Sequence, residues 1–461
     1  MASETTRTTA SARTTGTGAE GVPVPSAHTW RKQVLVLAIV LTAVNLRPAI
    51  TSLGALLEEV RDGIGLSGGA AGLLTSVPPL CFAVFGVMAP RLAHRFGPTR
   101  VVCAGLVALT AGLLLRPYAG GVPGFLAASA LALMGIAVGN VLMPVIVKHH
   151  FPDRVGPMTG LYSMALALGT ATAAAITVPL TGALGGSWQL GLAVWAGLAG
   201  VAVVPWALFG RAGGAAGRGR GAAAGRPGAS AGARAEGRPA TRPGQPEPRA
   251  GTYPESRPGA HAARPAPLRI TRSRTAWALA VFFGLQATGA YVTMGWMPQI
   301  FRDAGVPAGT AGLLLAVTMV LGVPLAFVIP RLATRLPHQG PIVVALGVCG
   351  LAGYAGLYVA PAAGAWVWAV LLGVANCAFP LALTMVGMRA RTGAGVARLS
   401  GFAQSVGYLI SIPGPLLIGV LYQATGDWHV PLTLMALLLV PQTAVGILAG
   451  RNRTVEDEPT P

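Results

Sequence analysis

Twelve apolar stretches, each about the length of a membrane span, dominate the sequence and limit what it can fold into. A helix needs about 20 mainly apolar residues to cross a bilayer. Charged residues make up only 10% of the chain, against about 25% in an average soluble domain. We therefore predict an all-α polytopic membrane protein with twelve transmembrane helices. The expected spans are residues 34–57, 69–90, 99–117, 121–147, 157–183, 188–209, 275–300, 308–330, 340–360, 364–388, 397–422 and 429–450.

The loops between these stretches alternate in charge. Arginine and lysine gather in every second loop and beside both outermost spans, for example at Arg31, Lys32 and Arg154. The intervening loops hold few basic residues and several acidic ones. The positive-inside rule therefore places both termini in the cytoplasm of a bacterial-type cell (inner or plasma) membrane. The net charge of +19 then reflects topology, so we expect no nucleic-acid partner.

The gap between the sixth and seventh spans divides the chain into two halves. It is rich in Gly, Ala, Pro and Arg and has almost nothing apolar enough to pack, which predicts a disordered cytoplasmic linker. The expected organisation is a disordered cytoplasmic N-terminal tail at 1–30, a six-helix half at 31–209, the linker at 210–274, a second six-helix half at 275–450 and a cytoplasmic C-terminal tail at 451–461.

An internal repeat relates the two halves. The segment GLLTSVPPLCFAVFGVMAPRLAHRFG (residues 72–97) aligns without a gap with GLLLAVTMVLGVPLAFVIPRLATRLP (residues 312–337), an offset of 240 residues. At the same offset, Gly65 falls on Gly305. Shared composition alone would not keep a constant offset. We therefore predict two parallel six-helix repeats with a substrate site between them near the middle of the membrane.

Two six-span halves, a long central loop and the basic turn PRLAHRFGPTR after the second span resemble the major facilitator superfamily. The turn is similar to the superfamily signature Gly-x-x-x-Asp-Arg-x-Gly-Arg-Arg, although His94 stands where the acidic residue is expected. The resemblance implies a gate on the cytoplasmic side, formed by this turn and its repeat after the eighth span. The implied gating-loop residues are Arg91, Arg95, Gly97, Arg331 and Arg335.

A closer resemblance covers the first quarter of the chain. The motif NLRP followed by GLLTSVPPLCF is similar to the start of the cyanate/2-nitroimidazole (CynX/NimT) transporter family. This resemblance implies a membrane transporter but does not fix its substrate.

The first span carries an arginine near its centre. On a helix, Arg47 shares one face with Thr51, Gly54 and Glu58, which follow it at i+4, i+7 and i+11. This face runs from the middle of the membrane to the outer mouth, and we expect it to line the pathway. Pro48 lacks an N–H group, so the helix should bend or loosen beside Arg47.

Arg47 is interpreted as a substrate contact. An arginine inside a membrane costs a few kcal/mol on insertion scales unless it finds a partner, and the planar guanidinium suits a small oxyanion, a carboxylate or a nitro group. The alternative is a tie to Asn140, to Gln404 or to a backbone carbonyl. At the 240-residue offset Arg47 meets Ala287, so the second half has no equivalent cation and a shared scaffold role is less favoured.

Other polar residues within the spans complete the predicted site. In the superfamily, spans 1, 4, 7 and 10, with help from 5 and 11, surround the cavity. The resemblance therefore implies that Tyr291 of span 7 and Gln404 and Tyr408 of span 11 contact the substrate. Such residues also serve as ordinary contacts between helices. The predicted substrate-binding residues are Arg47, Thr51, Asn140, Tyr291, Gln404 and Tyr408.

Three further residues are expected to have structural roles. Asn45 lies on a different face from Arg47 and should bond a neighbouring helix. Arg116, at the outer end of the third span, should reach the membrane interface, and a second substrate contact is the less favoured alternative. Trp296, toward the outer end of the seventh span, fits an aromatic belt at the same interface.

No catalytic or metal-binding constellation is visible in the sequence. It has no compact Ser–His–Asp, paired-carboxylate or Cys/His cluster and no phosphate-binding GxxxxGK[ST] motif, and its four cysteines are scattered singly. We therefore expect neither an enzyme nor a cofactor or metal. The expected partners are a small-molecule substrate and the lipid bilayer, and we expect a monomer.

These observations predict a secondary active or facilitative transporter. Its expected cargo is a small anion, cyanate-like or a small organic acid, moved by alternating access with Arg47 at the central site. No Asp or Glu lies near the centre of a span, which favours a uniporter, an exchanger or co-transport balanced by the substrate's own charge. An exporter of 2-nitroimidazole-like or other drug compounds is the main alternative. A receptor or scaffold that does not transport and a membrane enzyme are less favoured.

Overall fold

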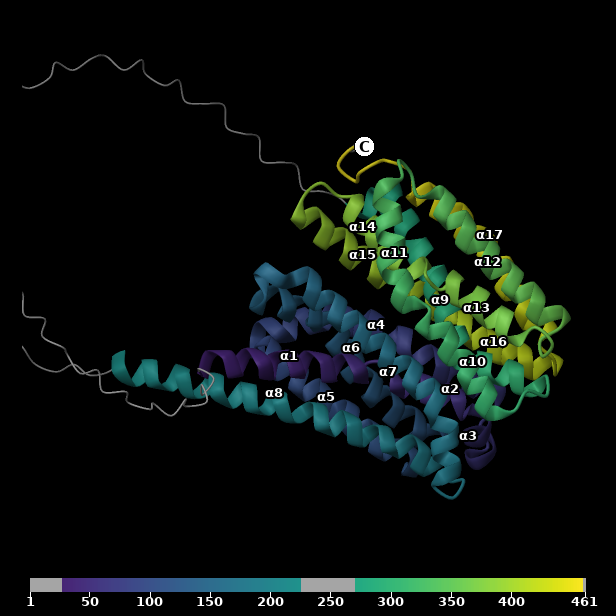
Figure 1. Cartoon of the computed structure of the whole chain (residues 1–461), viewed down its shortest axis with the longest axis horizontal. Coiled ribbons are helices and arrows are strands. Elements are labelled where there is room, and N and C mark those ends of the chain that lie inside the picture. The colour runs from purple at the N-terminus through teal and green to yellow at the C-terminus, as the bar shows by residue number, and fades with distance from the viewer. Residues whose placement is uncertain (1–26, 225–269, 459–461) are drawn as a thin grey trace, which may run out of the picture.

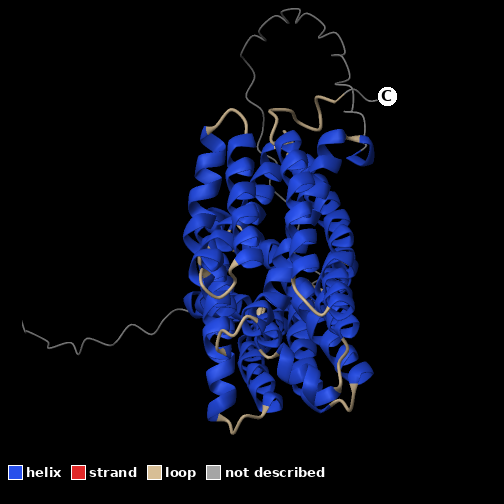
Figure 2. Ribbon diagram, turned by 90° about the vertical axis from the view of Figure 1, so that its right-hand side faces the viewer, coloured by secondary structure: helices blue, strands red, loops and turns tan. Residues whose placement is uncertain are grey.

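The computed structural model describes residues 27–224 and 270–458, which are almost entirely helical (Figure 2). Within these two ranges, twelve helical stretches are long and apolar enough to cross a membrane, and each overlaps one predicted span. The predicted fold class is therefore confirmed. In chain order the helices are α1 Ala27–Asn45, α2 Pro48–Ala55, α3 Leu57–Ile64, α4 Gly68–Phe96, α5 Pro98–Leu115, η1 Arg116–Tyr118, α6 Val122–His150, η2 Pro152–Arg154, α7 Val155–Ala183, α8 Trp188–Ala224, η3 Ile270–Arg272, α9 Arg274–Asp303, α10 Ala308–Val320, α11 Gly322–Arg335, α12 Gly340–Val359, α13 Ala365–Ala375, α14 Ala378–Met388, α15 Gly393–Ser411, α16 Pro413–Thr425 and α17 His429–Ala449.

The helices form two bundles that lie side by side, α1–α8 in one and α9–α17 in the other (Figure 1). The bundles contact each other where α2 meets α9, where α4 meets α15 and α16, and where α7 meets α10. In span numbers, span 1 meets span 7, span 2 meets span 11 and span 5 meets span 8. Span 8 is the counterpart of span 2, and span 11 is the counterpart of span 5. The contact between spans 2 and 11 is therefore equivalent to the contact between spans 8 and 5, as a two-fold relation between parallel repeats requires.

The two bundles converge at one end and diverge at the other (Figure 1). The start of α1 and the C-terminal segment 451–458 lie at the diverging end, and α3 lies at the converging end. Close packing explains the convergence, because a methyl group at Gly54 of α2 would collide with the carbonyl oxygen of Met294 in α9. A methyl group at Gly72 of α4 would lie 2.7 Å from the carbonyl oxygen of Leu416 in α16.

Span 1 is broken at Arg47, as predicted. Helix α1 ends at Asn45, α2 begins at Pro48, and the residues between them form a turn. Pro48 cannot donate the backbone hydrogen bond that would continue α1. The Asn45 side chain donates to the carbonyl oxygen of Leu198 in α8 at 3.2 Å, which confirms its expected bond to a neighbouring helix.

The repeat is visible in the backbone. Gly65, at the end of α3, and Gly305, just after α9, have φ angles of 67° and 86°. Only glycine adopts this left-handed region without strain. The equivalent turn therefore recurs in both halves at the offset of 240 residues that the sequence shows.

The ends of the predicted segments differ from the structure in two places. Residues 210–224 continue α8 where a disordered linker was expected. The rest of that linker, 225–269, and most of the expected N-terminal tail lie outside the described residues. Within the expected C-terminal tail, Val455 is buried and its N–H group donates to the carbonyl oxygen of Arg389 at 2.9 Å, so residues 451–458 pack against the second bundle.

Large apolar side chains are exposed on many of the spans, among them Leu37, Leu114, Val201 and Leu437. In a lipid bilayer these side chains meet hydrocarbon, and the helical backbone between them is already hydrogen-bonded internally. The exposed surface therefore fits a multi-pass membrane protein.

Candidate substrate site

Arg47 lies in the break of span 1 and is partly exposed. Its Nη1 atom lies 3.8 Å from the sulfur of Met294 in α9, and a thioether is a weak acceptor. The ion pairs found among the described residues involve other cations. Much of the donor capacity of this guanidinium is therefore left for a ligand.

Three tyrosines from both bundles surround Arg47. Its guanidinium interacts electrostatically with the hydroxyl groups of Tyr162, Tyr291 and Tyr408, and it also forms a side-chain hydrogen bond with Tyr291. The Tyr162 hydroxyl also donates to Oδ1 of Asn140 at 3.3 Å. The structure thus brings together four of the six predicted binding residues, from α6 and the break in the first bundle and from α9 and α15 in the second.

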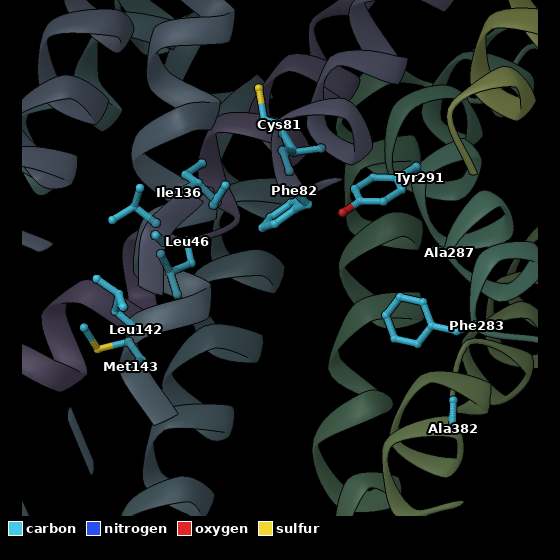
Figure 3. Close-up of a cluster of buried hydrophobic side chains, with 14 of the residues drawn as sticks. Leu46, Cys81, Phe82, Ile136, Leu142, Met143, Phe283, Ala287, Tyr291 and Ala382 are labelled. Carbon is cyan, nitrogen blue, oxygen red and sulfur yellow. The ribbon is translucent and has the colours of Figure 1, made fainter. Parts of the chain in front are cut away.

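An aromatic wall adjoins these tyrosines. Phe82 of α4 stacks on Tyr408 with ring centroids 5.1 Å apart, and Phe283 meets the same ring edge-on at 5.1 Å. Figure 3 shows Phe82 and Tyr291 facing each other from the two bundles. Sequence reasoning missed both phenylalanines, although Phe82 is the last residue of the motif GLLTSVPPLCF. Flat aromatic faces beside a planar cation suit a small planar ligand.

Thr51 and Gln404, the other two predicted residues, have local partners. The Thr51 hydroxyl is fully buried and donates to the carbonyl oxygen of Arg47 at 3.4 Å, so in this conformation it supports the start of α2. The Gln404 amide donates to Oγ of Ser400 on its own helix at 2.7 Å. No hydrogen bond within the described residues joins Gln404 to Arg47.

The face of span 1 that was expected to line the outer pathway is packed against α9 in this conformation. Gly54 abuts Met294, and Glu58 forms an ion pair with Arg302 at 2.8 Å. The converging end therefore closes the route from Arg47 past Gly54 and Glu58.

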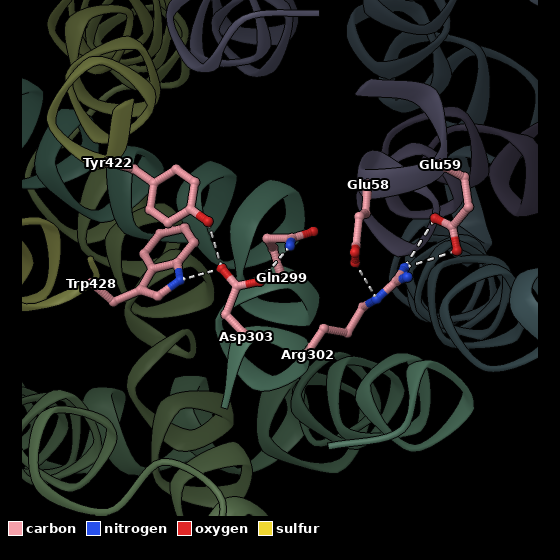
Figure 4. A network of polar contacts seen from close by, with 7 residues as sticks. All are labelled: Glu58, Glu59, Gln299, Arg302, Asp303, Tyr422 and Trp428. Carbon is pink, nitrogen blue, oxygen red and sulfur yellow. Dashed lines mark hydrogen bonds and ion pairs between the residues drawn. The ribbon is translucent and has the colours of Figure 1, made fainter. Parts of the chain in front are cut away.

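Two polar clusters close the converging end (Figure 4). Arg302 of α9 bridges to the other bundle through Glu58 and also through Glu59, at 2.9 Å. Beside it, Asp303 accepts hydrogen bonds from Tyr422 at 2.8 Å and from Trp428 at 2.7 Å. The first cluster joins the two halves. The second holds the end of α9 within its own half, and Arg61 of α3 reaches it from the other bundle, 5.6 Å from the centre of the Tyr422 ring.

Trp296 does not take part in an aromatic belt. It is fully buried, and its indole N–H donates to the hydroxyl of Thr75 in α4 at 3.2 Å. The expectation of an interfacial role was wrong because the side chain points toward the other bundle and not toward lipid.

The prediction that Arg116 reaches the membrane interface was also wrong. It is 2% exposed and donates from Nη1 to the carbonyl oxygen of Ala49 at 3.0 Å. The short helix η1, which carries Arg116, packs against α6 and α8, so the side chain reaches inward and not to the membrane interface.

At the diverging end, a groove of about 500 Å³ lies between α4 and α15, lined by Pro90 and Phe402 among others. The arginines of the predicted gating loops lie at this end, are exposed and have no ion pair within the described residues. Gly97 has a φ of 85°, so the turn between α4 and α5 requires glycine. These residues are Arg91, Arg95, Gly97, Arg331 and Arg335.

Comparisons with known proteins point to one superfamily. A model of the Major Facilitator Superfamily matches residues 34–412. The uncharacterized transporter YycB of Bacillus subtilis (strain 168) is 33% identical over 91% of this chain and 94% of its own length. In Escherichia coli (strain K12), the 2-nitroimidazole transporter is 30% identical over 92% of this chain and 96% of its own length. The cyanate transport protein CynX of the same organism is 28% identical over 88% of this chain and 94% of its own length.

The fold agrees with that grouping. A crystal structure of a bacterial homologue of the human lysosomal transporter Spinster superposes with a TM-score of 0.68, at 14% identity, over 94% of this chain and 99% of that chain. At this identity the likeness concerns the fold alone.

Proposed function

This chain belongs to the Major Facilitator Superfamily and is a membrane transporter, not an enzyme, and from that premise we propose that it carries a small anion, cyanate-like or a small organic acid, by alternating access. The observation that carries the proposal is the Arg47 guanidinium. It is partly exposed between two bundles, contacts a thioether sulfur and the Tyr291 hydroxyl, and has two more tyrosine hydroxyls near it, but it has no carboxylate partner among the described residues. An anion would supply the missing charge and accept several of its N–H groups.

The arrangement of the two ends supports the proposed mechanism. The converging end is sealed by packed glycines and by the Arg302 ion pairs, while the exposed gating-loop arginines at the diverging end hold no ion pair within the described residues. With the basic, termini-bearing end in the cytoplasm, this conformation is open to the inside. Rocking of the two bundles about Arg47 would then expose the site to the other side. One chain contains both bundles, so we propose that it works as a monomer.

The coupling proposed here needs no acidic residue at the site. The fourteen acidic residues of the chain lie outside the middles of the spans, and the described ones nearest the pathway, Glu58 and Glu59, are engaged by Arg302. Uniport, exchange or co-transport balanced by the anion's own charge therefore fits better than proton antiport through a buried carboxylate.

Export of 2-nitroimidazole-like or other drug compounds is the alternative function. The aromatic wall of Phe82, Tyr408 and Phe283 favours it, as does the relative that is named a 2-nitroimidazole transporter. A neutral ring would depend mainly on this wall, whereas an anion would depend mainly on Arg47.

Transport by purified protein in liposomes tests the two functions. Uptake of cyanate, nitrate, acetate and 2-nitroimidazole would be measured for the wild type, Arg47→Ala, Arg47→Lys and Phe82→Ala. A hydrogen bond to a charged group contributes about 1.5–3 kcal/mol, so Arg47→Ala should weaken anion affinity roughly 10- to 100-fold, and Arg47→Lys less. Arg451→Ala is the matched control, because Arg451 is an exposed arginine that follows the last helix, α17.

Normal anion affinity in both Arg47 variants would remove Arg47 from the site. Transport of 2-nitroimidazole alone, lost in Phe82→Ala and kept in Arg47→Ala, would select the drug-export alternative.

A further inference from the structure

A cavity of about 20 Å³ lies beside Arg116, between the central site and the converging end. Arg116 is 2% exposed, and its Nε and Nη2 atoms have no hydrogen-bond partner among the described residues. Ser129 lines the same cavity, and its hydroxyl is also buried without a partner there. The cavity wall therefore carries free donors on two buried side chains.

The charge of Arg116 is not neutralised within the described residues. The ion pairs there involve Arg302, Arg391 and His429. The ring of Phe125 lies 5.7 Å from the guanidinium carbon, and this cation–π contact offsets only part of the cost of burial. A buried charge without a counter-charge is strongly unfavourable, so the site calls for an anion.

The walls of this cavity come from both bundles. Arg116 and Ser129 belong to the first bundle, and Tyr291 and Gly295 belong to α9 of the second. Tyr291 also interacts with Arg47, so it borders both the central site and the Arg116 cavity. Any motion that separates α9 from the first bundle enlarges the cavity and joins it to the route past Arg47.

We propose that Arg116 and Ser129 form a second site for a small monovalent anion, filled when α9 moves away from the first bundle. As it stands, the cavity has room for about one water-sized particle, so the anion enters as Tyr291 and Gly295 withdraw. The guanidinium then supplies the charge and the free N–H groups, and Ser129 supplies a hydroxyl donor. The proposal rests on the proposed anion transport for its ligand, and chloride from the medium and the transported anion share this chemistry.

The second half has no equivalent cation. Span 9, the counterpart of span 3, contains no Arg or Lys. Near its converging end, Tyr354 is 6% exposed and interacts with Thr293 of α9 through a side-chain hydrogen bond. A neutral pair thus joins span 9 to span 7 near this end, whereas in the first half Arg116 bonds span 1. The cation at Arg116 is therefore not required by the scaffold that the halves share.

Equilibrium binding to the purified full chain tests the second site. Binding of labelled cyanate, and separately of chloride, would be measured in gluconate buffer for the wild type, Arg47→Met, Arg116→Met and the double variant. We expect two anions per wild-type chain, one in each single variant and none in the double variant. Competition between the two anions in Arg47→Met shows whether the second site takes chloride, cyanate or both, and each of these results supports an anion site.

Two anions bound to Arg116→Met, or none bound to Arg47→Met, would overturn the proposal. Loss of one anion in Arg116→Met together with unchanged binding and transport in Arg47→Met would instead refute the role of Arg47 and leave the second site in place.

A milder variant covers the case in which Arg116→Met does not fold. Ser129→Ala should weaken the anion bound to Arg47→Met about five- to tenfold. Ser76→Ala is its matched control, because Ser76 is equally buried but its hydroxyl already donates to the carbonyl oxygen of Gly72 at 3.0 Å. Equal anion affinity in Ser129→Ala and Ser76→Ala would reject the second site.

Discussion

Two arginines, one in each half, are buried to the same extent but differ in their partners. Arg116 is 2% exposed and Arg389 is 1% exposed. Arg389 donates from Nε to the carbonyl oxygen of Ala449 at 2.9 Å, and from Nη2 to the side chain of Gln339 and to the carbonyl oxygen of Gly450. Arg116 makes one such bond, and two of its nitrogens have no partner among the described residues.

The difference separates a structural arginine from one available to a ligand. Arg389 joins the ends of α12, α14 and α17 within one bundle. Arg116 faces the boundary between the bundles, as Arg47 does, and both belong to the first half. The unsatisfied positive charge thus gathers on one side of the pathway, opposite α9.

Replacing Arg389 should have the largest effect on stability. Arg389→Met leaves two buried acceptors without a donor, the carbonyl oxygen of Ala449 and the side-chain oxygen of Gln339, and each unsatisfied group costs about 1–3 kcal/mol. The carbonyl oxygen of Gly450 keeps a bond from the backbone N–H of Gln339. We expect the free energy of unfolding to fall by about 3–5 kcal/mol, measured by thermal unfolding of the purified protein. Arg116→Met removes an unneutralised charge and should cost much less. Equal losses of stability in these two variants would contradict the distinction between them.

Removing the ion pairs of Arg302, which join the two bundles at the converging end, should have an intermediate effect. Arg302 is 17% exposed, and its partners Glu58 and Glu59 are 40% and 29% exposed. Partly exposed ion pairs contribute about 1 kcal/mol or less. Arg302→Gln should therefore shift the equilibrium toward opening of the converging end by up to about fivefold.

The labelling rate of a cysteine introduced at Thr293, which is 5% exposed, would report this shift in a background without the native cysteines. Asp427→Asn is the control, because Asp427 is paired with His429 within the second bundle. The same opening should give anions access to Arg116 while Arg389 stays covered. An unchanged labelling rate in Arg302→Gln would show that the glycine contacts, and not the ion pairs, hold this end closed.

Much of the fold could be predicted because its causes are local or imposed by the bilayer. Span length follows from membrane thickness, which the twelve stretches match. The break at Arg47 follows from Pro48, and the recurrent turns follow from Gly65 and Gly305. Each of these features needs only a short segment of sequence.

The parts that could not be predicted depend on which helices meet. Trp296 and Thr75 are far apart in the chain, so nothing in either span showed that they would bond. Arg116 is at the end of a span, where snorkelling to the interface is the usual outcome. Its inward direction depends on the packing of η1 against α6 and α8 and on its bond to the carbonyl oxygen of Ala49. Phe82 and Phe283 are apolar residues within apolar spans, and no periodic pattern marks them as part of a site.

The smallest effect is expected for a change at Glu458 in the C-terminal segment. Like Arg389, Glu458 has its hydrogen-bond partners within the second bundle. Glu458 accepts hydrogen bonds from the backbone N–H groups of Arg274 and Thr275 at the start of α9, where the helix dipole favours a negative charge. Partial burial raises the pKa of Glu458, but the hydrogen bonds from Thr275, Ser273 and Arg274 together outweigh it and leave the pKa below its ordinary value. The carboxylate therefore stabilises the protein above the ordinary glutamate pKa, and this stabilisation is lost as the pH falls through the lowered value.

Glu458→Gln should cost about 0.5 kcal/mol at neutral pH and should flatten the dependence of the melting temperature on pH below about pH 4.5. Transport should not change, because Glu458 contacts the start of α9 and not the pathway. Melting curves of the wild type and Glu458→Gln between pH 3.5 and 7 would measure the effect. A wild-type melting temperature that does not fall relative to the variant in acid would show that the segment is held by Val455, whose backbone bonds Arg389, and not by the charge of Glu458.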